Sequence, residues 1–346
     1  SPIVHIFNIQ TCNETKAFIE AAKKKNKKIV LSPIYWNLLD STYIYYLSYF
    51  KLYNYDLPDF VKLLIIKFFN FFICIIPKLR KKHKNGIDKG LYSSKKNRFT
   101  GKNILDSADI IMPNSPEEMN EIIKYFGVDE KINDKVVTVP NAADFQLKCS
   151  NNAEKLPILF DTIDNFVLQV GRIEPIKNQL NTLRALINDK DIPLVFIGKP
   201  VDDFYYRQLK AEAAMRGNVH FINELSHDLI MKIYGIAKVH VLPSFRESPG
   251  LVSIEAKSLG CNIVTASEKF CPIKYYEFDK LGYICNPYNT KSIRHSIISA
   301  LSSSTGILDE TYKLKFSYKN VAKIVYDAYI NLIKENNGSN NNISKL

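Results

Sequence analysis

The stretch Glu247-Ser248-Pro249-Gly250-Leu251-Val252-Ser253-Ile254-Glu255 joins an apolar run, residues 239–242, to a predicted helix over residues 251–259. The first turn of a helix leaves N–H groups without partners inside the helix, and the helix dipole adds partial positive charge there. Both effects favour a phosphate group. The amides at this end of the predicted helix are those of Gly250, Leu251 and Val252.

Two carboxylates accompany this phosphate-binding end. Glu247 lies in the loop, and Glu255 lies about one turn into the helix, where it can reach a ligand that lies across the helix end. Carboxylates repel phosphate, but their oxygens accept hydrogen bonds from neighbouring sugar hydroxyls. The stretch therefore favours a ligand that carries both a phosphate and a sugar.

A second loop stands in the same position relative to its strand. It reads Val170-Gly171-Arg172-Ile173-Glu174-Pro175-Ile176-Lys177-Asn178, after a predicted strand and before a predicted helix. Gly171 permits the backbone to approach a ligand closely. Arg172 and Lys177 can both extend toward one anion, Arg172 as a planar fork and Lys177 as a mobile charge. The alternative for two such cations is an ordinary solvated loop.

Alternating strands and helices surround both loops. Strands are predicted at 166–170, 194–197, 219–221, 239–242 and 262–265, with helices at 179–187, 203–215 and 226–236. This alternation is typical of a parallel sheet with helices on both faces, which binds ligands at the carboxyl ends of its strands. An earlier run has strands at 3–7, 28–31, 109–112 and 136–139 and a helix at 116–126 capped by Ser115. We place the domain boundary in the polar stretch 141–165.

Length and composition agree with a globular protein of two domains. The chain has 346 residues, 46% of them hydrophobic and 24% charged, which is long enough for two packed cores. A net charge of +12 favours anionic partners: nucleic acid, anionic lipid or phosphorylated small molecules. The six cysteines show no CxxC or other metal-ligand spacing, which favours a reducing cytoplasm and no structural metal.

Residues 41–85 interrupt the alternation, and we predict a membrane-associating insertion there. The stretch 60–76 is apolar apart from Lys62, Lys67 and Asn70, and it is too short and too charged for a confident membrane span. A helix in the plane of an anionic membrane surface fits better, with the basic residues 78–82 on the lipid headgroups and the preceding tyrosines at headgroup depth. The alternative is a helix buried in this protein or in a dimer interface. The tyrosines are Tyr43, Tyr45, Tyr46, Tyr49, Tyr53 and Tyr55.

Taken together, these motifs resemble the family 4 glycosyltransferases of the GT-B fold, an α/β fold of two Rossmann-like domains whose parallel sheets face each other across a cleft. The resemblance rests on the E-x7-E motif of Glu247 and Glu255, on the loop 171–178, and on the run Glu-Ala-Lys-Ser-Leu-Gly-Cys-Asn-Ile-Val-Thr-Ala-Ser at 255–267. Residues 110–115 and 139–144 also resemble segments of that family. The resemblance implies a retaining transferase that takes a hexose from a nucleotide diphosphate sugar, a UDP-sugar or else a GDP-sugar, without a metal or another cofactor.

The resemblance also implies roles for single residues. Arg172 and Lys177 would hold the donor diphosphate and neutralise the leaving group, Glu247 would contact the transferred sugar, and Glu255 would bind the ribose hydroxyls. The other donor-binding residues implied are Gly171, Gly250, Leu251 and Val252.

The expected acceptor is a glycan or a lipid-linked molecule in surface polysaccharide or glycoconjugate synthesis. The expected location is cytoplasmic, on the inner face of the cell membrane. Nucleic acid is not expected as a partner, because the basic clusters border an apolar helix rather than an RNA-binding motif. The alternative function is a catalytically silent partner subunit that binds nucleotide or glycan.

Two features depart from the family pattern. The family usually has a histidine after the strand that is here 28–31, whereas this chain reads Ser-Pro-Ile-Tyr-Trp at 32–36. His5 or Tyr35 is expected to line the cleft instead, with a core histidine as the alternative for His5. The chain also enters at what resembles a middle strand, so we expect an incomplete N-terminal domain.

The expected domains are four. They are an N-terminal acceptor-side domain at 1–155 that includes the insertion 41–85, a nucleotide-sugar-binding domain at 156–316, a helix at 317–334 that crosses back to the N-terminal domain, and a disordered tail at 335–346.

Overall fold

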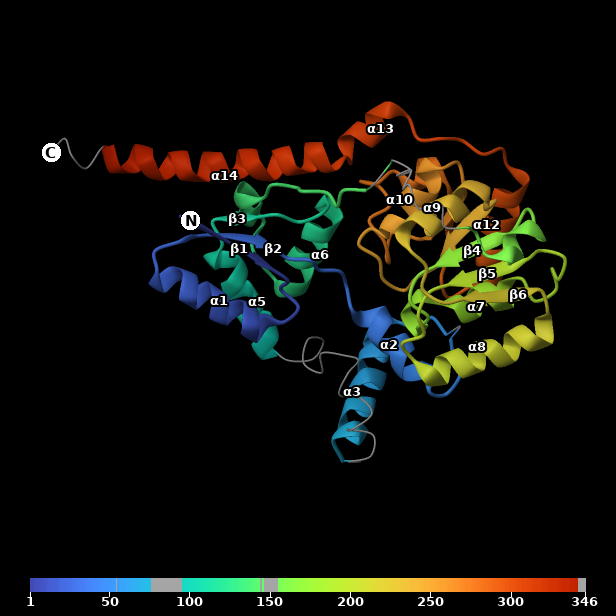
Figure 1. Cartoon of the computed structure of the whole chain (residues 1–346). Helices are drawn as coiled ribbons and strands as arrows, with labels where there is room; N and C mark the ends of the chain where they lie inside the picture. The colour runs from blue at the N-terminus through green and yellow to red at the C-terminus, as the bar shows by residue number, and fades with distance from the viewer. Residues whose placement is uncertain (54, 76–94, 144, 146–154, 342–346) are drawn as a thin grey trace. The chain divides into compact units, whose positions relative to one another are not determined.

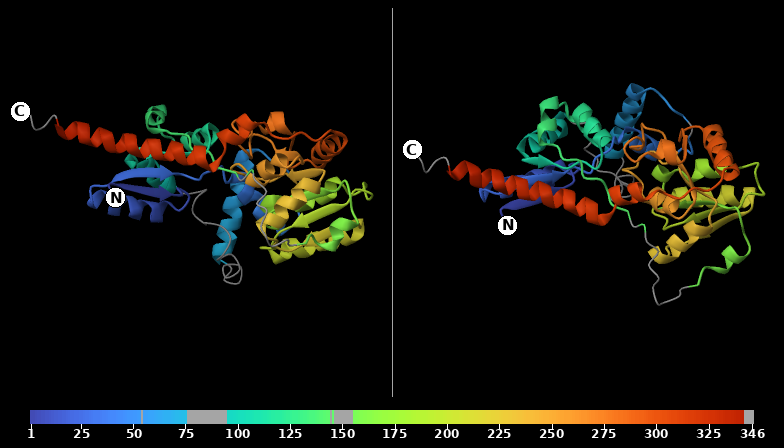
Figure 2. Two further views of the ribbon diagram at one scale, coloured as in Figure 1. Left: turned by 45° about the horizontal axis from the view of Figure 1, so that its top comes forward. Right: turned by 90° about the horizontal axis from the view of Figure 1, so that it is seen from above.

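The computed structural model describes residues 1–53, 55–75, 95–143, 145 and 155–341. Contacts between residues divide the chain into two compact units. Unit 1 consists of residues 1–37, 81–142 and 314–346, and unit 2 consists of residues 38–80 and 143–313. Figures 1 and 2 show the two units with their helices and strands.

Unit 1 is built on a parallel sheet of three strands in the order β1-β2-β3. The strands are β1 (Ile3–Phe7), β2 (Lys28–Ser32) and the short β3 (Ile110–Ile111). The further strand predicted at 136–139 is reduced to an isolated bridge between Ile111 and Val136. The helices are α1 (Cys12–Lys24), α5 (Lys95–Ser107), α6 (Pro116–Phe126) and α14 (Tyr318–Asn341), and Figure 1 shows α14 on one face of the sheet and α1 and α5 on the other.

The bounds of α6 and its N-cap Ser115 were predicted correctly. Ser115 accepts a hydrogen bond from the Glu118 N–H at 3.1 Å, Pro116 opens the helix, and Gly127 ends it with a φ of 65°. These residues satisfy the groups that a helix end leaves without partners. Helix α14 packs through Ala328 and Leu332 on Val30 of β2 and on Met112, which follows β3, so this helix belongs to the core of unit 1.

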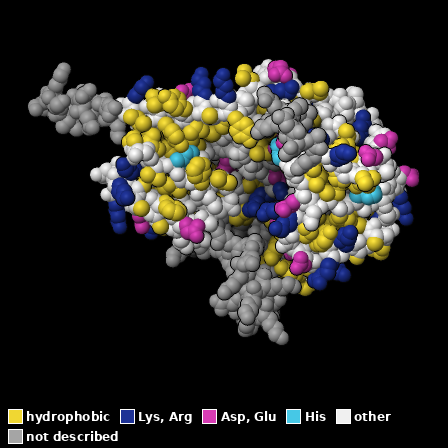
Figure 3. All heavy atoms as spheres, viewed as in Figure 1, with side chains coloured by type: hydrophobic (Ala, Val, Ile, Leu, Met, Phe, Trp, Pro, Cys, Tyr) yellow, Lys and Arg dark blue, Asp and Glu magenta, His cyan; other side chains and the backbone are white. Residues whose placement is uncertain are grey.

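The tail expected to be disordered from residue 335 is helical as far as Asn341, and residues 342–346 lie outside the described residues. No proline interrupts residues 335–341, so the backbone can continue the hydrogen bonding of α14. In Figure 3, hydrophobic side chains gather on the visible face of unit 1. An apolar pocket of about 680 Å³ lies along β1 in this unit, lined by Ile3, His5, Phe7 and Phe18 among others.

Unit 2 is built on a parallel sheet of six strands in the order β6-β5-β4-β7-β8-β9. The strands are β4 (Val167–Val170), β5 (Leu194–Ile197), β6 (Val219–Ile222), β7 (Val239–Leu242), β8 (Asn262–Ala266) and β9 (Tyr283–Cys285). The five strands predicted for this half of the chain are confirmed, and β9 is an addition. The sheet and the neighbouring helices share a core of apolar residues that includes Leu180, Leu209 and Ile297.

The helices of unit 2 lie on both faces of this sheet. Helices α7 (Gln179–Ala185), α8 (Asp203–Arg216) and α12 (Thr290–Ser302) share one core with the sheet, and α9 (His227–Ile236) packs beside α10 (Leu251–Ser258). Two short helices, α11 (Phe278–Leu281) and α13 (Glu310–Lys315), follow in the connections.

The aromatic segment that we assigned to the N-terminal domain is grouped with unit 2 as far as residue 80. It forms α2 (Leu39–Ser48) and α3 (Asp59–Ile75), while residues 76–94 lie outside the described residues. Tyr53 explains the grouping, because its side chain is buried in the core of unit 2 and its hydroxyl donates a hydrogen bond to Gln208 at 2.9 Å. Sequence order alone did not indicate this partner.

Candidate functional site

The strand order of unit 2 reverses between β4 and β7. From β4 the chain moves outward through β5 to β6, and from β7 it moves outward through β8 to β9 on the other side. In open α/β sheets, ligands bind at such a reversal, outside the carboxyl ends of the two strands. The loops that leave β4 and β7 here are the two loops singled out in the sequence. They lie side by side, since the N–H of Phe245 donates to the carbonyl of Ile176 at 2.8 Å.

Amide side chains fix the loop that follows β4. The amide of Gln169 donates to the Lys177 carbonyl at 2.6 Å, and the amide of Gln179 donates to the Arg172 carbonyl at 2.9 Å. Asn178 is fully buried with a φ of 63°, and its amide donates to the carbonyls of Pro243 and Pro287, each at 2.9 Å. The loop is therefore held to the loops after β7 and β9, which limits the positions open to Lys177.

Lys177 and Glu247 meet across the two loops. The Lys177 Nζ lies 2.5 Å from the Glu247 Oε1, and the two side chains are 19% and 8% exposed. Glu247 is also fixed by its backbone, since its N–H donates to the Phe270 carbonyl at 2.8 Å. Arg172, by contrast, is 64% exposed and pairs with Glu174 at 2.9 Å. The structure thus brings Lys177 and Glu247 into one ion pair and leaves Arg172 at the rim.

The N-terminus of α10 follows Glu247 directly. Gly250 precedes the helix with a φ of 91°, in the left-handed region that favours glycine. A Cβ atom at this position would lie 2.9 Å from Leu242 Cδ2 and 3.3 Å from Glu247 Oε2. Only a glycine therefore allows the backbone of the loop to pass this close to the carboxylate. Helix α10 begins at Leu251 as the sequence predicted, so the amides of its first turn, those of Leu251 and Val252 among them, follow Glu247 closely in the chain.

Glu255 lies farther along α10, and its Oε1 is 3.3 Å from the Nε2 of His227. His227 is half exposed and opens α9, whose N-cap is Ser226. Sequence reasoning missed His227, because its approach to Glu255 depends on the packing of α9 against α10. The sequence did contain one indication of this residue, which is a histidine in the first turn of the helix predicted before the strand 239–242.

A buried histidine lies beneath the ion pair. His240 on β7 is fully buried, and its Nε2 accepts a hydrogen bond from the Val170 N–H at 3.5 Å, where β4 and β7 separate. Burial, with a contribution from the charge of Lys177, lowers the pKa of His240 to about 3. The imidazole is therefore neutral at physiological pH, and it fills the space between β4 and β7 without adding a positive charge. Sequence reasoning missed this residue as well.

His5 and Tyr35, the residues expected to line a cleft, both lie in unit 1. His5 is bound at both ring nitrogens, 2.5 Å from the Tyr329 hydroxyl of α14 and 2.9 Å from the Ser32 hydroxyl. Tyr35 is fully buried and packs against Tyr125 and Phe126. His5 is thus held by two hydrogen bonds and also lines the apolar pocket along β1 of unit 1, whereas the burial of Tyr35 means that its side chain does not line an open surface.

Glu118 explains why Tyr35 is buried. Its two carboxylate oxygens accept hydrogen bonds from the backbone N–H groups of Tyr35 and Asn114, each at 2.5 Å. Glu118 thereby ties the segment after β2 to the segment after β3. Burial raises the pKa of this carboxyl to about 7, although the two N–H groups act in the opposite direction.

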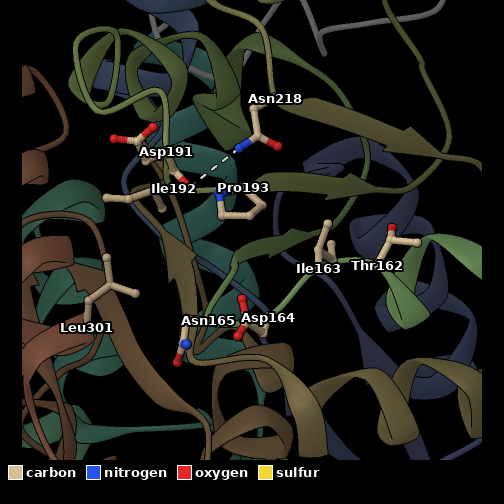
Figure 4. Close-up of a pocket in the computed structure, with 9 residues that line it drawn as sticks. All are labelled: Thr162, Ile163, Asp164, Asn165, Asp191, Ile192, Pro193, Asn218 and Leu301. Atoms are coloured by element: carbon tan, nitrogen blue, oxygen red, sulfur yellow. Dashed lines mark hydrogen bonds between the residues drawn. The ribbon is translucent and has the colours of Figure 1, made fainter.

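The pocket of Figure 4 lies at the opposite edge of the sheet of unit 2. Asn165, Pro193 and Asn218 line it, and they precede β4, β5 and β6 respectively. Its volume is about 460 Å³. It is therefore at the amino ends of the strands and separate from the Lys177–Glu247 pair. Among the residues that the structure describes, no group of three or more His, Cys, Asp or Glu side chains is placed to hold a metal ion.

Comparison with known proteins matches the part of the chain that carries this site. Residues 151–315 match the family model described as glycosyl transferases group 1. The D-inositol 3-phosphate glycosyltransferase of Corynebacterium glutamicum (strain R) is 25% identical over 53% of this chain and 47% of that protein. The O-antigen chain mannosyltransferase B of Escherichia coli is 24% identical over 73% of this chain and 65% of that protein. The chain thus spans about half the length of the first curated relatives that it matches.

A solved structure extends the likeness to nearly the whole chain. The Anabaena protein HepE, crystallised in complex with UDP, superposes with a TM-score of 0.62 at 15% sequence identity, covering 95% of this chain and 78% of that chain. Identity this low supports the fold alone. The matched range 151–315 includes the whole six-stranded sheet of unit 2. The chain therefore has the GT-B fold and carries, over residues 151–315, a domain of the glycosyl transferases group 1.

Proposed function

We propose that the protein is a retaining glycosyltransferase that moves a hexose from a nucleotide diphosphate sugar to a glycan or a lipid-linked acceptor. The observation that carries the proposal is the Lys177–Glu247 ion pair at the strand reversal, beside the N-terminus of α10. We take a UDP-sugar as the first donor to test and a GDP-sugar as the second. The proposed reaction uses no metal and no cofactor besides the nucleotide sugar.

The ion pair favours a ligand that carries both a phosphate and a sugar. A phosphate alone would gain Lys177 but would meet the negative charge of Glu247, which lies 2.5 Å away. A nucleotide sugar satisfies both groups, because its diphosphate takes the ammonium and the first-turn amides of α10, while its sugar hydroxyls donate to the carboxylate. Arg172, at the exposed rim, would reach the same diphosphate from the solvent side.

The chemical step depends on stabilising the leaving group. The bond between the anomeric carbon and the phosphate oxygen breaks, and its electron pair stays on that oxygen. The acceptor hydroxyl oxygen forms the new bond to the carbon, and the acceptor proton passes to the phosphate oxygen of the departing nucleoside diphosphate. Lys177 is held by the fixed loop at its backbone, so its charge is oriented before the reaction begins. Preorganised donors of this kind contribute on the order of 100-fold to 1000-fold in rate each.

The nucleoside would extend along α10 toward Glu255 and His227. Glu255 accepts hydrogen bonds from the ribose hydroxyls in this proposal. His227 lies 3.3 Å from the same carboxylate and is half exposed, so we assign it to the nucleoside end of the donor site. Gly250 leaves the backbone space that the diphosphate needs between the two ends.

The names of similar proteins support the kind of acceptor and the kind of donor that we propose. One relative is named an O-antigen chain mannosyltransferase, and HepE was solved with UDP. We infer a role in surface polysaccharide or glycoconjugate synthesis, on the cytoplasmic face of the cell membrane as a peripheral protein. Within the described part of the chain, none of the helices has both the length and the apolar character needed to cross a bilayer.

Release of nucleoside diphosphate from a panel of UDP- and GDP-sugars tests this proposal. We expect slow release by the unchanged protein and a loss of at least about 100-fold in the Lys177→Ala and Glu247→Ala variants. Lys190→Ala is the matched control, because Lys190 is exposed and precedes β5 at the opposite edge of the sheet. Equal release by all variants would sink the proposal. Nucleotide binding without any release or transfer would instead identify a catalytically silent partner.

A further inference from the structure

Helix α3 buries a charged side chain and exposes apolar ones, the reverse of the usual amphipathic helix of a globular protein. Its lysine Lys62 is fully buried, with its Nζ 2.6 Å from Asp40 Oδ1 and 2.6 Å from Asp56 Oδ1. Four large apolar side chains of the same helix are 58% to 66% exposed. They are Phe60, Leu64, Phe68 and Phe71. The charged group is thus inside the protein, and a row of apolar side chains is outside.

The four side chains form one continuous row, which we call the α3 stripe. Their spacing of four, four and three residues places them on one face of a helix. At about 1.5 Å per residue the stripe is roughly 17 Å long. Figures 1 and 2 show α3 extending beyond α2 and away from the sheet of unit 2, so the stripe lies on a projecting, convex element.

The contacts on the opposite face of α3 fix this orientation. Phe69 stacks on Tyr46 with ring centroids 5.3 Å apart, and the Tyr46 hydroxyl donates to Asn70 Oδ1 at 2.6 Å. Asp40, the partner of Lys62, also accepts a hydrogen bond from the Tyr288 hydroxyl at 2.7 Å. Rotating α3 to bury the stripe would move Lys62 away from Asp40 and leave the buried carboxylate without this partner, which costs several kcal/mol. The exposure of the stripe is therefore built into the packing.

The three polar residues of the apolar stretch 60–76 do not share one environment. Lys62 is buried, Asn70 is half-buried and Lys67 is exposed. Of the tyrosines expected at the depth of lipid headgroups, Tyr43, Tyr46 and Tyr53 are buried within unit 2. These three tyrosines anchor the segment to the protein, whereas the four side chains of the stripe are exposed.

We propose that the α3 stripe inserts into the surface of an anionic lipid bilayer. A projecting row of phenyl and aliphatic groups suits the boundary between headgroups and acyl chains, which receives the apolar face of a helix lying in the membrane plane. Charge complementarity selects the anionic bilayer, because Lys67 is exposed beside the stripe and the protein carries a net charge of +12. The basic residues 78–82, expected on the lipid headgroups, lie outside the described residues, and the stripe is defined without them.

This inference specifies the membrane contact of the proposed function but does not depend on donor chemistry. The stripe and the Lys177–Glu247 pair share no residue. A protein that binds membranes without releasing nucleotide would contradict the proposed transferase alone. A transferase that does not bind membranes would contradict this inference and the proposed peripheral location, but not the proposed transfer reaction.

Flotation with vesicles tests the inference. The unchanged protein should bind vesicles of equal parts phosphatidylcholine and phosphatidylglycerol, and should bind pure phosphatidylcholine weakly. A variant with serine at positions 60, 64, 68 and 71 should bind the mixed vesicles at least about tenfold more weakly, because the apolar area that enters the bilayer is lost. The control carries serine at four other exposed apolar positions of unit 2. They are Ile158, Met215, Ile236 and Ile307.

Two further measurements keep the inference open to refutation. Hydrogen exchange of the unchanged protein, with and without mixed vesicles, should show protection that includes α3, and this holds even if the serine variant does not fold. Equal vesicle binding by the stripe variant and the control variant would overturn the inference. A concentration-dependent dimer that only the stripe variant loses, without any binding of vesicles, would also overturn it and would identify the stripe as an interface between copies of the chain.

Discussion

Replacing Lys62 with methionine should release α2 and α3 from unit 2. Lys62 is fully buried between Asp40 and Asp56, each at 2.6 Å, and Asp40 is 5% exposed. Methionine keeps much of the length of the lysine stem but removes its charge, so the Asp40 carboxylate loses its most buried partner. Breaking a buried ion pair on one side costs roughly 3 to 5 kcal/mol.

The remaining partners of Asp40 set the size of the effect. Lys269 Nζ still lies 3.1 Å from Asp40 Oδ2, and the Tyr288 hydroxyl still donates to Asp40 at 2.7 Å. We therefore expect the lower end of the range, about 3 kcal/mol. Since about 1.4 kcal/mol corresponds to a factor of ten in an equilibrium constant, the population with the segment undocked should rise about 100-fold.

Hydrogen exchange of the α2 amides, Leu39 to Ser48, measures this population. Exchange should be about 100-fold faster in Lys62→Met, because the segment opens locally while the rest of the unit stays folded. Lys67→Met is the matched control on the same helix, since Lys67 is exposed and surface substitutions change stability by less than about 0.5 kcal/mol. The same exchange rate in both variants would refute the reasoning that the buried lysine docks the segment.

Three further predictions concern single residues. Burial raises the pKa of Glu118 from its ordinary 4.5 to about 7, so the folded protein binds this proton more tightly than the unfolded chain does. The protonated carboxyl therefore adds to the free energy of unfolding below pH 4.5, and this contribution is lost as the pH rises through 7. Glu118→Gln should remove this pH-dependent loss, which is about 3 kcal/mol at about 1.36 kcal/mol per pKa unit. If urea unfolding gives the unchanged protein and Glu118→Gln the same change of unfolding free energy with pH, the prediction is wrong. Gly250→Ala places a Cβ 2.9 Å from Leu242 at a φ of 91° and should cost about 1 to 3 kcal/mol in thermal unfolding; an unchanged melting temperature would contradict the strain. His227→Ala should raise the KM for the nucleotide sugar about tenfold with little change in kcat, whereas the exposed His295→Ala should change neither, and a fall in kcat alone would place His227 elsewhere.

The sheet of unit 2 could be predicted because its strands are short apolar runs bounded by turn residues. The run at 239–242 and its successor at 262–265 needed no tertiary information, and Ser115 marked the start of α6. Strand β9 was missed because its three residues are too few for a periodic pattern. Lys177 and Glu247 were both identified, yet their contact joins residues far apart in sequence and follows only from the strand reversal.

The orientation of α3 could not be predicted, because a helical pattern shows which residues share a face but not which face contacts the protein. The usual assumption is that a lysine points to solvent. Lys62 is an exception, because two carboxylates pair with it inside the protein. Asp40 lies on α2, against which α3 packs, and Asp56 lies shortly before α3. The burial of Tyr35 depends likewise on Glu118, more than eighty residues later in the chain.

Binding of UDP by isothermal titration calorimetry tests most directly whether the donor site lies at the β4–β7 reversal. The unchanged protein and the Lys190→Ala control should bind UDP with the same Kd. Lys177→Ala should bind at least about tenfold more weakly, because a hydrogen bond to a charged group contributes about 1.5 to 3 kcal/mol. Equal affinity of Lys177→Ala and the control for UDP would contradict the assignment of the site.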